Sequence, residues 1–142
     1  MKPRDLFVSA LKSCIGTPYK WGGSDLNGLD CSGTIIYCLA QSGMPIKDTN
    51  AQGIFNLLKN RVIDRLQAPP GALYFYGEST TSIHHVMAVC EHWDGSGIIL
   101  IGAHGGDQTT ITPEDAAARK AFVGSVFGDY WLDKFVVAVD PF

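Results

Sequence analysis

Three segments within the first 60 residues carry apolar side chains at the spacing of an α-helix. Apolar side chains recur at helical intervals between residues 3 and 14, and Pro3 suits a first helical turn, so a helix is expected there. A second helix is predicted from about Cys31 to Gln41, before Ser42 and Gly43. A third is predicted over 50–59, where Thr49 or Asn50 can cap an apolar stripe.

Further along the chain the pattern becomes typical of strands. Short apolar runs predict strands at 72–76, 85–90, 98–103 and 135–139. A polar loop is expected over 77–82 and a hairpin turn over 94–97, and a cap residue followed by proline predicts a short helix over 113–120. Helices first and antiparallel-type strands afterwards indicate an α+β fold, with N-terminal helices packed on a mainly antiparallel sheet.

Composition narrows the class of protein. The 142 residues suit a single domain, 1–142, and 46% apolar with 18% charged residues is ordinary for a globular chain. A net charge of −3 with scattered Lys and Arg argues against nucleic acid as a partner. No apolar run is long enough for a membrane span. The N-terminus lacks the apolar core of a signal peptide, so synthesis in the cytoplasm without Sec export is expected.

A glycine-rich stretch from Gly16 to Gly33 delivers Cys31 to the predicted start of the second helix. Unpaired backbone N–H groups and the helix dipole favour an anion there, so this thiol is expected to ionise more easily than usual and to suit covalent catalysis. The alternative is a buried structural cysteine. The other three cysteines, Cys14, Cys38 and Cys90, are expected in the core as free thiols, and the four have no spacing typical of a metal site.

A cysteine nucleophile needs a base, and the chain has four histidines. His84 and His85 would point to opposite faces of a strand, so only one of them can meet Cys31. The register favours His85, although the apolar alternation alone does not decide, because both faces are largely apolar. His104 could orient the base through its other ring nitrogen, and each histidine has a purely structural alternative.

Several of these motifs together resemble a known family. The segments GTPYKWGG from Gly16, LDCSG from Leu29, APPGALYF from Ala68 and HVMAV from His85 resemble the NlpC family of papain-like cysteine peptidases, which cut bacterial cell-wall peptides. The resemblance implies a papain-like fold, Cys31 as nucleophile, His85 as base and Tyr19 lining the site. It also implies hydrolysis of peptidoglycan stem peptides between γ-D-glutamate and a diamino acid, with no metal or organic cofactor.

Two details of the expected site stay open. Asp30 and Ser32 could hold a free amino group of the stem, or Asp30 could simply cap the helix. The backbone N–H of Cys31 and the Tyr19 hydroxyl are candidate oxyanion donors. Family members often carry a third polar residue where this chain has Gly102. His104 stands two residues later and could take that role, or a backbone carbonyl or water could orient His85 instead.

Other functions fit the same residues. A papain-like amidase or acyltransferase acting on another amide or on lipid would keep Cys31 and His85. A catalytically silent cell-wall-binding module, or a structural domain with cysteines in its core, would not need their reactivity. A peptidase of this kind must reach the wall, so we expect a phage-type lysin, delivery by a secretion machine, or a domain of a longer chain.

Overall fold

The structure, a computed structural model, describes residues 2–93 and 97–142, and this part of the chain contains four α-helices. They are α1 (Pro3–Cys14), α2 (Cys31–Gln41), α3 (Ala51–Leu58) and α4 (Pro113–Arg119). All four were predicted. The Asn50 side chain accepts a hydrogen bond from the Gly53 N–H and caps α3, while Thr112 and Asp115 form a capping box at the start of α4.

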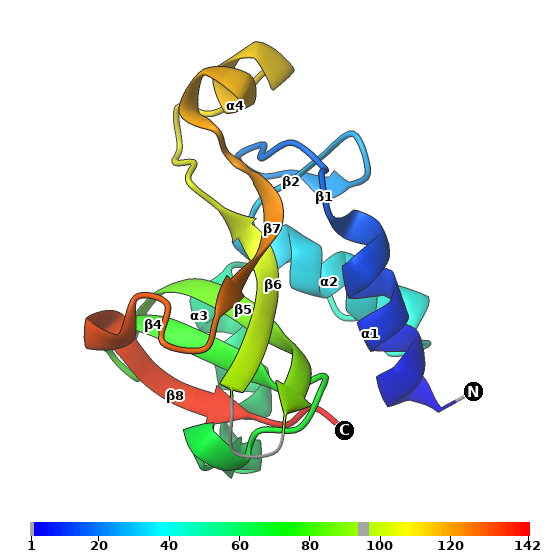
Figure 1. The fold of residues 1–142 in the computed structure, drawn as a ribbon, viewed down its shortest axis with the longest axis vertical. Helices are drawn as coiled ribbons and strands as arrows, with labels where there is room; N and C mark the ends of the chain where they lie inside the picture. The colour runs from blue at the N-terminus through cyan, green and yellow to red at the C-terminus, as the bar shows by residue number, and fades with distance from the viewer. Residues whose placement is uncertain (1, 94–96) are drawn as a thin grey trace.

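The main sheet has six strands in the order β3-β8-β4-β5-β6-β7. Neighbouring strands in it are antiparallel. The strands are β3 (Val62–Ile63), β4 (Leu73–Ser79), β5 (Ser82–Trp93), β6 (Gly97–His104), β7 (Phe122–Phe127) and β8 (Phe135–Val139). A separate two-stranded hairpin, β1 (Ser24–Asp25) with β2 (Gly28–Leu29), precedes α2. Figure 1 shows α1 and α2 beside the sheet and α4 beyond one of its ends.

The prediction of a loop over 77–82 is wrong for most of these residues, which belong to strands. β4 continues to Ser79 and β5 begins at Ser82, so only a tight turn separates them. Gly77 makes this possible, because a Cβ there would lie 2.1 Å from the Ser82 carbonyl oxygen, and the register shifts on both sides of it. Strands β1, β2, β3 and β7 were not predicted. The hairpin turn expected over 94–97 lies, for residues 94–96, outside the described residues.

Two apolar clusters hold the sheet. The first lies between the sheet and the helices α1, α2 and α3, and includes Phe7 of α1, Leu39 of α2 and Ile54 of α3. The second lies on the other face and includes Tyr76 and Met87. Cys14, Cys38 and Cys90 are buried in the first cluster as free thiols, as predicted.

The two ends of the chain meet at one end of the molecule (Figure 1). Arg4 forms an ion pair with Asp140 at 2.9 Å, and the Phe7 and Phe142 rings lie 5.4 Å apart. This contact ties α1 to the end of β8. Within the described ranges, none of the helices has the length and apolar character needed to cross a bilayer.

Candidate active site

The glycine-rich loop fixes the start of α2. Asp30 is the cap residue, and its two carboxylate oxygens accept the Gly33 N–H at 2.7 Å and the Gly22 N–H at 2.8 Å. Gly33 packs so closely that a Cβ there would lie 1.9 Å from the Gly23 carbonyl oxygen. Loop and helix therefore meet backbone against backbone, and Cys31, the first residue of α2, is held at their junction.

The Cys31 thiol is partly exposed and lines a pocket of about 1000 Å³. Burial, reinforced by the Asp30 charge, raises the pKa of Cys31 to about 11. Backbone N–H groups, including that of Val86, favour the thiolate but are outweighed. The expectation of an easily ionised thiol is therefore wrong for the free protein. The helix start does face the sulfur, but desolvation and a neighbouring carboxylate act more strongly.

His85 lies on β5 with its ring among aromatic side chains. It is paired with Tyr76 of β4, and the two ring centres are 5.5 Å apart. Tyr130 and Trp131 lie 6.2 Å and 5.9 Å from the His85 ring. Burial, with a smaller contribution from His104, lowers the pKa of His85 to about 4, so the imidazole is neutral at pH 7. Its Nε2 atom is buried without a hydrogen-bond partner.

Cys31 and His85 line the same pocket, from α2 and β5. His84 also reaches that pocket, but it is exposed and contacts Ser82 through Nε2 at 3.2 Å. Among the described residues no hydrogen bond joins the Cys31 thiol to His85. Catalytic contacts are often long before substrate binds, so shared lining of one pocket is the relevant geometry here. At neutral pH the arrangement presents a neutral thiol and a neutral imidazole.

His104 is the last residue of β6 and also lines the pocket. The pairing of β5 with β6 reaches Ala88 and Ile101, and continuing that register by three residues brings His85 opposite His104. The ring of His104 lies 5.8 Å from that of Tyr130, and burial lowers the pKa of His104. Gly102, at the position where a polar residue was expected from the sequence, faces Met87, whose Cε would lie 2.9 Å from an added Cβ.

The remaining predicted residues surround the thiol. Tyr19 is 5% exposed, and burial together with the proximity of Cys31 raises its pKa, so its hydroxyl stays protonated. Ser32 is buried and its hydroxyl donates to Asp30 Oδ1 at 3.2 Å. Asp30, Ser32 and Tyr19 all line the pocket. The carboxylate of Asp30 already accepts three hydrogen bonds from its own chain, which is the arrangement of a helix cap.

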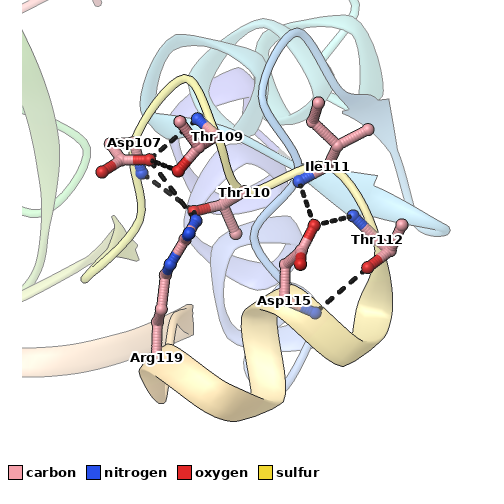
Figure 2. Close-up of polar contacts among 7 residues, drawn as sticks. All are labelled: Asp107, Thr109, Thr110, Ile111, Thr112, Asp115 and Arg119. Atoms are coloured by element: carbon pink, nitrogen blue, oxygen red, sulfur yellow. Dashed lines mark hydrogen bonds and ion pairs between the residues drawn. The ribbon is translucent and has the colours of Figure 1, made fainter.

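A loop between β6 and α4 forms another wall of the pocket, and Figure 2 shows how it is held. Asp107 Oδ1 accepts from the backbone N–H and hydroxyl of Thr109, at 2.8 Å and 2.6 Å. Arg119 of α4 donates to the Thr110 hydroxyl at 2.7 Å. The loop presses Gly106 against the Tyr19 ring, where a Cβ would lie 2.4 Å from Cδ1. Helix α4 thereby helps to position Tyr19.

Two aromatic residues of the site were not predicted from the sequence. Tyr130 and Trp131 follow β7 and line the pocket beside His85. Trp131 is 43% exposed and has a left-handed backbone with φ of 47°. An adjacent aromatic pair in the polar run GDYWLDK was the available signal. No group of three or more His, Cys, Asp or Glu that could hold a metal ion occurs within residues 2–93 and 97–142.

Comparison with known proteins places this fold and this site in context. The model of the NlpC/P60 family matches residues 16–140. The "Probable peptidoglycan endopeptidase LytE" of Bacillus subtilis is 42% identical over 53 residues, which is 37% of this chain and 16% of the relative. The "Bifunctional muramidase/DL-endopeptidase CwlT" of the same species is 26% identical over 136 residues, covering 93% of this chain and 36% of the relative.

A solved structure supports the same assignment. The NlpC/p60 domain of the peptidoglycan hydrolase SagA is 25% identical, with a TM-score of 0.64 over 96% of this chain and 97% of that chain. The chain spans well under half the length of the two curated relatives. The family match covers the glycine-rich loop, Cys31, His85 and His104 alike. The chain belongs to the NlpC/P60 family and has its α+β fold, as the motifs in its sequence indicated.

Proposed function

We propose that this chain is a cysteine peptidase that hydrolyses amide bonds in the stem peptides of peptidoglycan, with Cys31 as nucleophile and His85 as base. The observation that carries the proposal is the meeting of Cys31, at a helix start, and a neutral, half-buried His85 in one pocket. Family membership adds support, and so do relatives named as peptidoglycan endopeptidases.

The protonation states define the order of events. Because thiol and imidazole are both neutral at pH 7, His85 takes the proton from Cys31 as the sulfur attacks the amide carbonyl. A carbon–sulfur bond forms, and the carbonyl oxygen becomes an oxyanion. The backbone N–H of Cys31 and the protonated Tyr19 hydroxyl are the donors on hand to stabilise it.

Breakdown of the intermediate completes the cycle. The carbon–nitrogen bond breaks, and His85 gives its proton to the leaving amine. The acyl group is then a thioester on Cys31. His85 next takes a proton from water, the resulting hydroxide attacks the thioester, and the thiol is regenerated with release of the acid. The steps use the side chains named, the backbone N–H of Cys31 and one water molecule.

The charge of the pocket supports a substrate with a free amino group. Its described lining contains the carboxylates of Asp30, Asp48 and Asp107, of which Asp107 pairs with Arg119 of α4 at 3.4 Å, and no lysine or arginine is among those lining residues. A diamino acid or the free amino end of a stem peptide would be attracted to such a surface. We therefore propose the γ-D-glutamyl–diamino acid bond as the bond that is cut.

The test is digestion of purified muropeptides, with products identified by mass spectrometry. Wild type is expected to release a fragment ending in γ-D-glutamate and a fragment beginning with the diamino acid, and Cys31→Ala is expected to release neither. Cleavage at a sugar–peptide amide instead would favour an amidase that uses the same two residues. Binding without cleavage by folded wild type would overturn the enzymatic proposal.

A further inference from the structure

Two neighbouring residues of this site each carry a buried polar atom without a partner. Within the described residues, the only buried side-chain nitrogen or oxygen atoms that lack a hydrogen-bond partner are the Tyr76 hydroxyl and His85 Nε2. An unpartnered buried polar atom costs free energy, so a pair of them in one cluster calls for a physical reason. Both belong to residues that face each other across β4 and β5.

The two rings belong to one cluster of aromatic side chains. Tyr76 is fully buried, and its ring lies 5.5 Å from the His85 ring at an angle of 44°. Trp131 stacks on Tyr76 at 5.9 Å and 24°, and Tyr130 meets it edge-on at 6.0 Å. Burial raises the pKa of Tyr76, so the phenol keeps its proton. An ordered water is the usual link between two buried polar atoms that do not contact each other directly.

We propose that Tyr76 is the positioning residue for His85, and that its phenol oxygen accepts the His85 Nε2–H directly or through one buried water. This inference rests on the proposed function, because it supplies the third member of that site. Nε2 is the ring nitrogen that is buried without a partner, so in this proposal Nδ1 is the nitrogen that acts as the base. Keeping the proton on Nε2 leaves the Nδ1 lone pair free to take the thiol proton.

With Tyr76 in this role, no polar side chain is needed at Gly102 to orient His85. A histidine side chain there would meet Met87 rather than open space. His104 is the alternative positioning residue, but its ring packs against the ring of Tyr130. Its effect on His85 is to disfavour the imidazolium by charge repulsion, which lowers the pKa of His85 further. The groups around the imidazole are thus Tyr76 from β4, His104 from β6, and Tyr130 and Trp131 from the segment after β7.

The chain offers a matched control. Tyr74 lies two residues before Tyr76 on β4, in the same apolar cluster and equally buried, but its hydroxyl donates to the Arg65 carbonyl oxygen at 2.5 Å. Tyr74→Phe and Tyr76→Phe each remove one buried hydroxyl from the same strand. Only Tyr76→Phe removes the proposed partner of His85. Thermal unfolding of both variants checks that the fold is kept.

The first readout needs no substrate. The ¹⁵N chemical shifts of the His85 ring at pH 7 report which nitrogen carries the proton. Wild type and Tyr74→Phe are expected to show the Nε2–H tautomer. Tyr76→Phe is expected to shift the tautomer ratio about ten-fold toward Nδ1–H, the factor that corresponds to one hydrogen bond. His104→Gln is expected to leave the ratio as in wild type.

The second readout is kinetic. With muropeptide substrate, Tyr76→Phe is expected to lower kcat about ten-fold with KM unchanged, because the base is mispositioned while binding is intact. A wild-type tautomer ratio in Tyr76→Phe, or a shift caused by His104→Gln or Tyr74→Phe instead, would overturn the inference while leaving the peptidase proposal in place. A tautomer shift in a protein that cuts no muropeptide would overturn the peptidase proposal alone.

Discussion

Asp30 caps helix α2 by accepting the backbone N–H of Gly33 at 2.7 Å, and its charge adds to the effect of burial in raising the pKa of the neighbouring Cys31 thiol. The carboxylate satisfies an unpaired N–H of the first turn, which stabilises the helix start. Its negative charge also opposes formation of a thiolate one residue away. One side chain therefore has a structural effect and an electrostatic effect that can be separated by mutation.

Asp30→Asn is expected to lower the pKa of Cys31 from its value of about 11 while keeping the cap. The amide oxygen still accepts the Gly33 N–H, whereas the charge and the acceptor of the Gly22 N–H are lost. The measurement is the rate of Cys31 alkylation by iodoacetamide against pH, mapped by peptide mass. Asp30→Ala is the control, since loss of the cap should cost about 1 kcal/mol of unfolding free energy. An unchanged Cys31 profile in Asp30→Asn would show that the carboxylate charge does not act on the thiol.

His85 is expected to remain a neutral base down to about pH 4. The acidic limb of kcat/KM should accordingly fall near pH 4, well below the value of 6.5 for an ordinary histidine. A limb near 6.5 would mean that the imidazole is solvated in the working enzyme.

The lowered pKa of His85 also predicts how the free energy of unfolding depends on pH. Between pH 6.5 and about 4 the unfolded chain binds a proton at His85 and the folded chain does not, so the unfolding free energy falls as the pH falls through this range. The contribution is at most about 1.4 kcal/mol per pH unit. In His85→Gln this part of the slope should disappear in urea titrations at several pH values. An identical slope in wild type and His85→Gln would contradict the assigned shift.

The buried thiols are expected to differ sharply from Cys31 in reactivity. Cys14 and Cys38 are fully buried with their sulfur atoms 3.9 Å apart, so reagents cannot reach them in the native state. Alkylation at pH 9, with and without guanidinium, should modify Cys31 alone in the folded protein and all the cysteines after unfolding. Modification of Cys14 or Cys38 as fast as that of Cys31 under native conditions would contradict this packing.

Trp131 is expected to tolerate glycine better than alanine. Its φ of 47° lies in the left-handed region, which costs a non-glycine residue about 1 kcal/mol. Both substitutions remove the stacking on Tyr76, so Trp131→Gly should be more stable than Trp131→Ala by about that amount in urea unfolding. The usual order, with alanine more stable, would show that this backbone conformation is not retained. Both variants should raise KM, because Trp131 forms part of the pocket wall.

Local signals in the sequence sufficed for the helices and for part of the site. The start of α2 at Cys31 follows from a cap residue, a glycine-rich loop and an apolar run, all contiguous in the chain. The placement of His85 on a strand follows from the apolar run after it. Each of these depends on residues that are neighbours in sequence, which is where pattern reasoning is strongest.

The rest of the site depends on contacts between distant parts of the chain. That Tyr76 faces His85 is set by the tight turn between β4 and β5 and the register shift at Gly77, which composition does not reveal. Tyr130 and Trp131 reach His85 only because β7 returns along β6. The direction of the Cys31 pKa shift depends on how deeply the thiol is buried, and the sequence position at a helix start alone indicated the opposite.

The central claim, that Cys31 attacks a stem-peptide amide, is tested most directly by trapping the acyl-enzyme. Wild type is mixed with a purified muropeptide, quenched with acid during turnover and digested for mass spectrometry. The account predicts a peptide containing Cys31 that carries the mass of the γ-D-glutamyl fragment as a thioester, and no such adduct in Cys31→Ser or His85→Gln. Turnover of the muropeptide by folded Cys31→Ala at the wild-type rate would contradict it.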